Sequence, residues 1–290
     1  MVSLSKGNYL SLLFVDKQYQ RKGIGKRLVE IIDNLVLGDL EVNAAINTRS
    51  FYEHLGFKIN GNLEKKEGIL YYPMIKMRSV KKRFNNYDEV VEFISSQKNR
   101  VYSLDNFKRY MEDLGNPQLI LDCVHIGGTN GKGSTTNYIK EVLKQSGYKI
   151  ATFTSPALYS RLDIIRINDQ FIDEQTMVDY ANRYVDLWLK YEISMFEIEV
   201  FIAIMYFIEQ KVDLALFEVG LGGLLDATNI IMPKLAINTN IGLDHVDYLG
   251  HDYQSIALNK AGIVKDGIDY LTGETKTECL EVFNEICRRH

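Results

Sequence analysis

The segment HIGGTNGKGST, from His125 to Thr135, combines four glycines, one lysine and three hydroxyl residues within eleven positions. Glycines let backbone N–H groups converge on one anion, and a helix beginning near Ser134 would add the positive end of its dipole. Lys132 is placed to reach outer phosphates, and the Ser134 or Thr135 hydroxyl to reach magnesium or a phosphate. We therefore favour phosphate binding over a turn of purely structural use. The predicted contacts are Gly128, Thr129, Asn130, Gly131, Lys132, Gly133, Ser134 and Thr135.

The loop departs from the general P-loop pattern in two places. Gly133 separates Lys132 from Ser134, and Ile126 stands where the first glycine is expected. The physical requirements, which are flexible backbone donors, a helix start and an ammonium group, are all still met.

Alternating strands and helices must position this loop. The apolar segments LILDCVHIGG, YKIATFTSP, VDLALFEVG and KLAINTNIG read as strands, and helical patterns such as STTNYIKEVLKQSG lie between them. This order implies parallel βαβ units, and ligands of such sheets gather at the carboxyl ends of the strands. We predict an α/β fold with a P-loop-type, mostly parallel sheet flanked by helices.

A basic and then polar stretch, SVKKRFNNYDE, separates two patterned regions. We place the boundary there, giving domains at 1–80 and 81–290. The first reads strand, helix, strand, helix, strand, and is predicted to be a small α+β domain.

Composition excludes several function classes. The 290 residues carry a net charge of −4, which provides no general attraction to nucleic acid or to an anionic membrane. The three cysteines have no CxxC spacing, so a disulfide framework is not expected and a reducing compartment fits. The N-terminus lacks the apolar core of a signal peptide, and no apolar run approaches the ~20 residues of a membrane span. We expect a cytoplasmic protein.

Several motifs, taken in order, resemble the folylpolyglutamate synthase/dihydrofolate synthase family of the Mur ligase superfamily. They are SLDNFKRYMEDLGNPQ, HIGGTNGKGST, TSPALYS, FEVGLGGLLDATN, TNIGLDHVDYLG and NKAGIVK, within about residues 87–266. The resemblance implies an ATP-dependent amide ligase acting on dihydropteroate or a folate. A carboxylate accepts the γ-phosphoryl group, and the amine of glutamate attacks the resulting acyl phosphate. Such chemistry needs charge neutralisation more than a protein nucleophile.

The resemblance also implies site residues. Ser155, Glu218 and His245 would hold a magnesium ion, and Asp244 would either orient His245 or be a solvated loop acid. Lys260 matches a lysine that is commonly carbamylated in the family, the alternative being a plain surface lysine on a helix. Positions on the pterin or folate side, which could equally belong to the core, are Phe196, Glu197, Leu225, Asp226 and Ala227.

The chain departs from the family pattern at several positions. Leu224 replaces an arginine and Asp163-Ile164 replaces Glu-Arg, which removes cations that would attract an anionic substrate. Val200 stands in place of a threonine, and Asn259 in place of a glutamate. Relatives continue for well over a hundred residues beyond the equivalent of His290. We therefore expect a missing C-terminal domain and weak ligase activity or none, unless a partner chain supplies that domain.

Residues from about Gly7 to Arg78 resemble the second half of a GNAT-type N-acetyltransferase. The stretch VDKQYQRKGIGKRL matches the family signature that cradles the pyrophosphate of acetyl-CoA, here at Gln20, Arg21, Gly23 and Gly25. Tyr52, in NTRSFYEHLGF, matches a tyrosine that often acts as a general acid, or else it packs in the core. The resemblance begins near the fourth strand of that fold, so we expect an exposed sheet edge.

Three interpretations remain open from the sequence. The first is the ATP-binding domain of a folate-type ligase behind a partial acetyltransferase. The second is an acetyltransferase with a working acetyl-CoA site and a vestigial ligase part. The third is a non-catalytic chain that at most binds nucleotide or completes itself with a partner.

Overall fold

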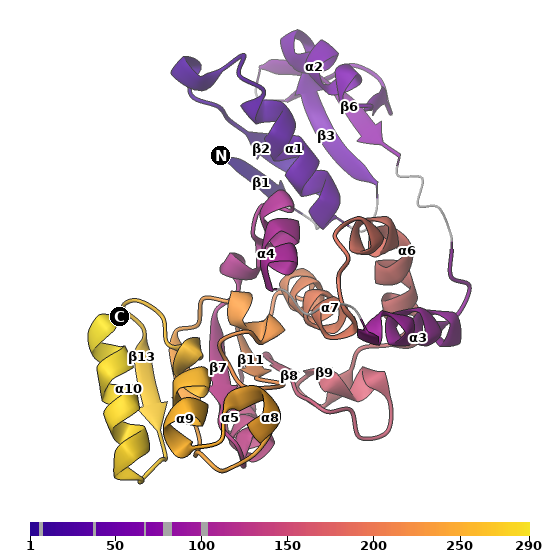
Figure 1. The fold of residues 1–290 in the computed structure, drawn as a ribbon. Helices are drawn as coiled ribbons and strands as arrows, with labels where there is room; N and C mark the ends of the chain where they lie inside the picture. Colours follow the sequence, from indigo (N-terminus) through magenta and orange to yellow (C-terminus); the bar gives the residue numbers. More distant parts are fainter. Residues whose placement is uncertain (6–7, 37–38, 67, 78–82, 100–103) are drawn as a thin grey trace. The chain divides into compact units, whose positions relative to one another are not determined.

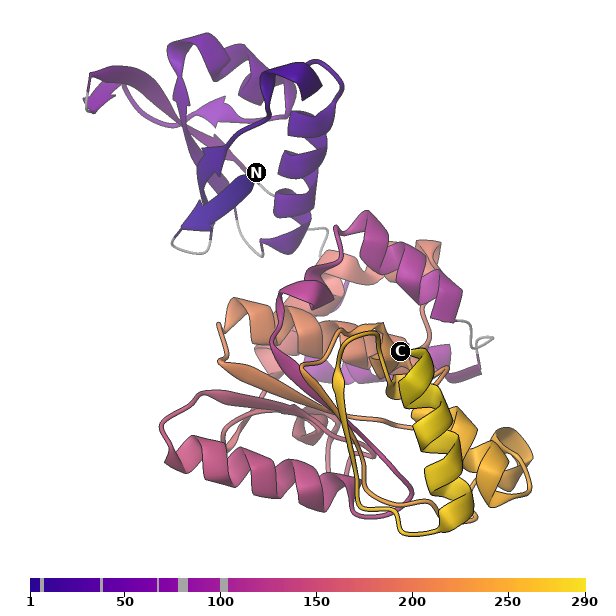
Figure 2. The same ribbon diagram turned by 90° about the vertical axis from the view of Figure 1, so that its left-hand side faces the viewer.

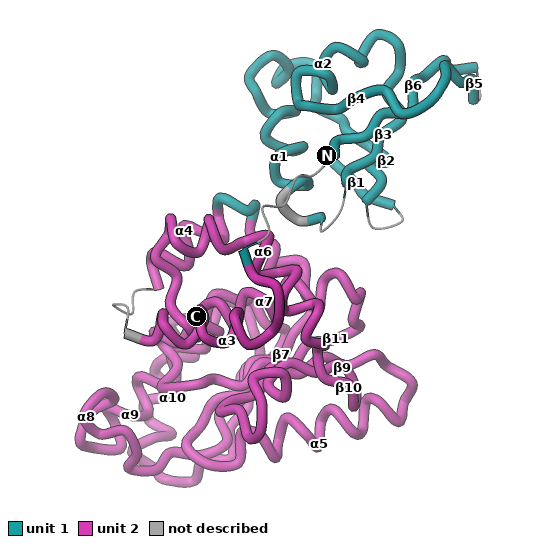
Figure 3. Tube along the Cα trace, turned by 90° about the vertical axis from the view of Figure 1, so that its right-hand side faces the viewer, with its two compact units in different colours: residues 1–83, 113–115 teal, residues 84–112, 116–290 magenta. Residues whose placement is uncertain are grey.

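The computed structural model describes residues 1–5, 8–36, 39–66, 68–77, 83–99 and 104–290. It divides into two compact units, residues 1–83 with 113–115 and residues 84–112 with 116–290 (Figure 3). The boundary predicted between residues 80 and 81 lies outside the described residues and stays a prediction. In the described part of the chain, no helix is long and apolar enough to cross a membrane.

The smaller unit is a mixed sheet with two helices. Its strands follow the order β1-β2-β3-β6-β4, and β5 also pairs with β6. Only β2 and β3 run parallel among its described pairs. The elements are β1 (Val2–Ser5), β2 (Tyr9–Leu13), α1 (Ile24–Leu35), β3 (Leu40–Ala45), α2 (Arg49–His54), β4 (Lys58–Ile59), β5 (Glu64–Lys66) and β6 (Ile69–Lys76). The predicted series of three strands and two helices is confirmed, and β1, β4 and β5 are additional.

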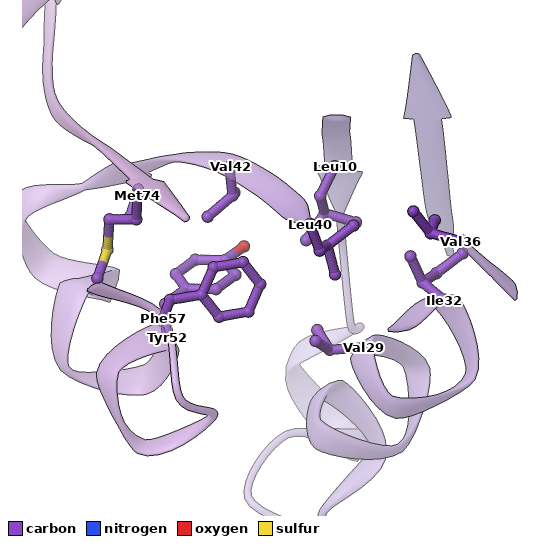
Figure 4. Packing of buried hydrophobic residues seen from close by; sticks show 10 residues of the cluster. Leu10, Val29, Ile32, Val36, Leu40, Val42, Tyr52, Phe57 and Met74 are labelled. Carbon is purple, nitrogen blue, oxygen red and sulfur yellow. The ribbon is translucent and has the colours of Figure 1, made fainter. Parts of the chain in front are cut away.

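One hydrophobic core holds this unit together (Figure 4). Alternate residues of β3 are buried, as a strand with one face on the core requires. Helix α1 and its C-cap supply Val29, Ile32 and Val36, spaced three and four apart on one helical face. The rings of Tyr52 and Phe57 meet edge to face, 5.4 Å apart. Tyr52 is 7% exposed, so the structure gives it the packing position that the sequence left open.

The larger unit is a seven-stranded sheet with helices on both faces (Figures 1 and 2). The order is β10-β9-β8-β11-β7-β12-β13, and the five strands from β8 to β13 in this order run parallel. The strands are β7 (Cys123–Gly127), β8 (Ile150–Phe153), β9 (Ile165–Ile167), β10 (Gln170–Phe171), β11 (Leu214–Glu218), β12 (Leu235–Asn238) and β13 (Asp269–Thr272). The predicted α/β class with a mostly parallel sheet is confirmed.

The helices of this unit are α3 (Tyr87–Ser96), α4 (Leu104–Asp113), α5 (Lys132–Gln145), α6 (Glu174–Lys190), α7 (Met195–Glu209), α8 (Val246–Leu249), α9 (Tyr253–Lys260) and α10 (Thr277–Arg289). On one face of the sheet, Val124 and Leu216 pack with Ile139 of α5. On the other face, Phe217 lies 5.8 Å from Phe207 of α7, measured between ring centroids. Both faces are covered, which explains why the strands read as continuous apolar runs.

Two predicted boundaries are wrong by a few residues. The strand expected from Leu119 begins at Cys123, because Asn116 takes a left-handed conformation and residues 117–120 form a 3₁₀ turn. The helix expected near Ser134 begins at Lys132, directly after Gly131. The helix therefore starts inside the glycine loop, which brings its amino end closer to a bound anion than predicted.

Candidate functional site

The glycine loop joins the central strand β7 to helix α5. Gly128 and Gly131 have φ angles of +124° and +81°, values that residues with a side chain rarely adopt. A Cβ atom on Gly128 would also collide with the hydroxyl of Thr239. The loop conformation therefore depends on glycine at both positions.

The amino end of α5 presents free hydrogen-bond donors. Gly131 caps the helix without any side-chain hydrogen bond. Within the described residues, the backbone N–H groups of residues 131–134 have no acceptor, while Thr135 N–H already bonds the carbonyl of Gly131. Gly131, Gly133 and Ser134 are exposed. Within the described residues, this row of unpaired donors at a helix start has the geometry that anion binding requires, and binding itself stays a prediction.

A second loop, which follows β12, holds the glycine loop in place. The Thr239 hydroxyl donates to the Asn130 carbonyl at 2.6 Å. Asn240 both donates to that carbonyl at 2.9 Å and accepts the Asn130 N–H at 3.1 Å. Thr129 accepts the N–H of Gly242 at 2.9 Å. Thr239 and Asn240 were not predicted as site residues. Their position in TNIG, directly after a predicted strand, could have indicated them.

Two lysines converge on the loop from inside. Lys132 Nζ donates to the carbonyls of Gly128 and Thr129, both at 3.2 Å, and Lys260 Nζ donates to Gly128 at 3.1 Å. Lys260 is only 4% exposed, which excludes a plain surface lysine. Burial, reinforced by the charge of Lys132, lowers the pKa of Lys260 to about 8. Lys260 therefore carries an unusually large share of neutral amine.

Glu218 ends β11, level with Ile126 of the neighbouring β7. It is 5% exposed, and burial raises its pKa against the opposing effects of the Lys132 charge and a hydrogen bond from the Ser155 backbone. Its Oε2 would lie 3.5 Å from a Cβ atom on Gly133. Ser155, Gly133 and Glu218 line one cavity of about 310 Å³. The structure thus brings two of the three predicted magnesium ligands together beside α5.

His245 lies apart from this cavity lining. Its imidazole is half exposed, with Nε2 3.7 Å from the Asp244 carboxylate. The backbone N–H of His245 donates to Asp244 Oδ1 at 2.9 Å. Asp244 also acts electrostatically on Lys260. Among the residues that the structure describes, no three His, Cys, Asp or Glu side chains gather into a metal site. The magnesium set, which includes a serine, stays a prediction.

The predicted substrate positions divide into two groups. Phe196, Leu225 and Asp226 line a largely apolar cavity of about 440 Å³. Glu197 and Ala227 are buried. Glu197 accepts hydrogen bonds from the N–H and Oγ of Ser194, the N-cap of α7, both at 2.7 Å. Neither of these two lines the cavity.

The carboxylate of Asp226 accepts hydrogen bonds from its own loop. The donors are the N–H groups of Leu221, at 2.8 Å, and Thr228, at 2.9 Å. The Thr228 hydroxyl in turn lies 2.8 Å from buried His125 Nε2. Burial lowers the pKa of His125 to about 3, so this histidine is neutral and structural.

A third cavity has a volume of about 740 Å³. It shares Phe196 with the apolar cavity and Ser155 with the cavity that Glu218 lines. Its wall carries an ion pair between Arg161 and Glu199. Glu199 is buried, and burial raises its pKa although Arg161 opposes this shift. This pair was not predicted, because Arg161 lies in a short 3₁₀ turn and Glu199 in an apolar helix, and no sequence pattern links the two.

The smaller unit carries a similar helix start. Gly23, with φ +79°, caps α1 without a side-chain hydrogen bond, and the N–H groups of residues 23–26 have no acceptor within the described residues. Gln20 donates to the Val15 carbonyl at 2.9 Å, and Arg21 is exposed. A Cβ atom on Gly25 would touch the Phe51 ring at 3.4 Å. All four predicted acetyl-CoA positions therefore surround one exposed helix start.

The fold places the larger unit among α/β proteins with a mostly parallel sheet, and its glycine loop joins β7 to the helix that follows. The Mur ligase middle domain matches residues 126–270, half of the chain, and an acetyltransferase (GNAT) domain matches residues 1–78. The chain belongs to the Mur ligase family, with a GNAT domain ahead of the ligase-type unit.

Curated relatives are named as dihydrofolate synthases or folylpolyglutamate synthases. The dihydrofolate synthase/folylpolyglutamate synthase of Bacillus subtilis is 38% identical over 194 residues, covering 64% of this chain and 45% of that protein. Folylpolyglutamate synthase of Lacticaseibacillus casei is 35% identical over 197 residues, covering 65% and 46%. The chain thus spans about half the length of the curated relatives it matches.

Solved structures agree with this assignment. An FPGS–AMPPCP–folate complex superposes with a TM-score of 0.67 at 33% identity, covering 71% of this chain and 52% of that one. Escherichia coli FolC in complex with DHPP and ADP gives a TM-score of 0.64 at 27% identity, covering 69% and 49%.

Proposed function

We propose that the larger unit binds ATP with magnesium and transfers the γ-phosphoryl group to the carboxylate of a folate-type substrate. The amine of glutamate then attacks the acyl phosphate, an amide forms, and phosphate leaves. One observation carries this proposal. The backbone N–H groups of residues 131–134 have no acceptor within the described residues, and the ammonium group of Lys132 belongs to the same loop. The relatives named as folylpolyglutamate and dihydrofolate synthases support the substrate class.

The chain's own groups suit phosphoryl transfer. Lys132 at present bonds two carbonyls of its own loop, so its ammonium can exchange them for phosphate oxygens. The fixed N–H groups need no reorganisation when an anion arrives, because the loop after β12 already holds them. Together they would neutralise charge on the outer phosphates.

The magnesium-side residues also fit. Glu218 has a raised pKa because burial is only partly compensated, and a nearby divalent cation would stabilise its ionised form. Ser155 lines the same cavity, and His245 would complete the set. When bound, magnesium would supply further charge neutralisation to the phosphates. The lowered pKa of Lys260 favours the neutral amine, which reacts with carbon dioxide to give an anionic carbamate and a proton.

The substrate would occupy the connected cavities. Phe196 stands between the apolar cavity and the one that reaches Ser155. A flat ring could pack on Phe196 and Leu225 while the attached carboxylate extends toward the nucleotide loop.

Isothermal titration with ATP and magnesium tests the first step. The intact chain should bind, and Lys132→Ala should weaken binding by about a hundredfold because it removes a charge-assisted contact. Lys144→Ala is the matched control, since Lys144 lies on the same helix but pairs with Asp169. Absence of binding by the intact chain would contradict the proposal. Phosphate release with ATP, glutamate and dihydropteroate, compared with a folate, tests the full reaction separately.

A second candidate function rests on the smaller unit. Its free N–H groups at residues 23–26, together with the GNAT match, favour binding of the acetyl-CoA pyrophosphate. Titration with acetyl-CoA should show binding that Arg21→Glu weakens about tenfold, whereas Lys65→Glu on exposed β5 leaves it unchanged. No binding by the intact chain would remove this candidate.

A further inference from the structure

A separate cavity of about 650 Å³ lies in the larger unit, and we call it the rear cavity. Its lining includes residues that lie three or four positions before three parallel strands, namely Leu119 before β7, Met232 before β12 and Lys265 before β13. The glycine loop follows the other end of β7, and none of its residues lines the rear cavity. The rear cavity shares no lining residue with the three cavities described above.

The wall of the rear cavity is mainly apolar and partly in contact with water. Four of its large apolar side chains are about half exposed, namely Leu119, Leu224, Met232 and Leu258. Isoleucines 230, 231 and 286 and Val264 complete this wall. Gathering several half-exposed apolar side chains around one hollow is unfavourable in water and marks a surface that a ligand can cover.

The polar side chains of the rear cavity are two lysines, the carboxylate of Glu112, three amides and His290. Lys108 and Lys265 both line it, and neither makes an ion pair within the described residues. Lys265 is half-buried, and its Nζ finds only the backbone carbonyl of Asn229, at 3.1 Å. Burial, followed by the charge of Lys108, lowers the pKa of Lys265 to about 8. Glu112 also lines the cavity; it is exposed and makes no ion pair with any residue that the structure describes.

We propose that the rear cavity binds an amphipathic carboxylate, with the carboxylate between Lys265 and Lys108 and the apolar body over Leu119, Met232 and Leu258. A half-buried ammonium without a counter-ion is electrostatically unsatisfied, and a carboxylate would supply the missing charge. The apolar body would at the same time remove hydrocarbon from water. Charge and shape thus select one chemical class, an organic monoacid with an aliphatic or aromatic body.

Titration with octanoate tests this proposal, using 1-octanol as the uncharged probe of equal length. The intact chain should bind octanoate and bind 1-octanol at least about tenfold more weakly. Lys265→Met should weaken octanoate binding by about tenfold or more. Leu119→Asp, a change at a half-exposed position that places a negative charge on the wall, should have a similar effect. Lys98→Met, at an exposed lysine outside the rear cavity, is the matched control.

Each outcome decides the proposal. Absence of octanoate binding, equal binding of 1-octanol, or octanoate binding unchanged in both cavity variants would overturn it. ATP binding, measured in the same samples, should be equal in all variants because no residue of the glycine loop lines the rear cavity. A loss of ATP binding would therefore expose a folding defect, and Leu119→Asp and Lys265→Met must each pass that check before comparison.

Discussion

The two units present nearly the same helix start in very different surroundings. Gly23 before α1 and Gly131 before α5 have φ angles of +79° and +81°, and each is followed by backbone donors without acceptors in the described residues. Around Gly131, a neighbouring loop and two lysines hold the backbone. Around Gly23, Gln20 makes one bond to Val15 and the cations are exposed. A short glycine motif therefore specifies donors, whereas the surrounding chain determines how firmly they are held.

Glycine-to-alanine changes should separate the two loops most strongly. At Gly128, φ +124° and the collision with Thr239 leave no room for a methyl group, so ATP affinity should fall by more than about a hundredfold. At Gly23 nothing lies within 4 Å of the added carbon, so only backbone strain of about 1 kcal/mol is expected. Titration with ATP and urea unfolding measure both effects. Equal losses of stability would contradict the comparison.

Removing one partner of an ion pair should reveal a second difference. Arg161→Met leaves Glu199 buried without its partner and should cost about 3 kcal/mol of unfolding free energy. Lys76→Met, which breaks a more exposed pair with Asp33 in the smaller unit, should cost less than about 1 kcal/mol. Adding Glu199→Gln to Arg161→Met should recover part of the loss. No recovery would show that packing, rather than the orphaned charge, caused it.

The buried lysine under the nucleotide loop predicts a pH effect. Its folded-state pKa of about 8 lies below the ordinary value of 10.5, so between these values the unfolded chain keeps a proton that the folded chain releases. Lys260 therefore contributes stability that is absent below pH 8 and grows to at most about 3 kcal/mol by pH 10.5. The difference in unfolding free energy between the intact chain and Lys260→Met should show this rise. A flat difference would contradict the burial assigned to Lys260.

The tethers of the two loops should give the smallest effects. Asn240→Ala removes two hydrogen bonds to Asn130 and should weaken ATP binding by about tenfold through loss of preorganisation. Gln20→Ala removes one exposed hydrogen bond and should change acetyl-CoA binding by no more than about threefold. Titration of each variant measures both changes. A larger effect at Gln20 than at Asn240 would reverse the contrast.

Much of the fold could be predicted because its signals are local. The apolar runs of β7, β11 and β12 fix parallel strands, and the glycines at 128 and 131 fix a loop between strand and helix. Ser155 and Glu218, which the family resemblance indicated, line one cavity. Short elements such as β9, β10 and α8 were missed, since three or four residues show little periodicity.

The remaining features depend on contacts that periodicity does not encode. The partnership of Asn240 with Asn130 joins residues 110 positions apart. Leu224, which stands in place of a family arginine, lines the rear cavity, and its sequence position gave no sign of this. The burial of Lys260 emerges only when its helix closes over Gly128. In each case the decisive neighbour comes from another loop, so the sequence indicates the residue without indicating its environment.

The order of strands determines where the sheet can accept insertions. Strands β11, β7 and β12 stand side by side in the middle of the sheet, and β10 and β13 form its two borders. The turn between β9 and β10 lies at one border of the sheet, so it should tolerate added residues or an attached reporter. Such an insertion would not shift the register that sets Glu218 level with Ile126. An insertion within β11, β7 or β12 would shift the register with the neighbouring strands. Engineering and natural variation alike should therefore concentrate at the borders.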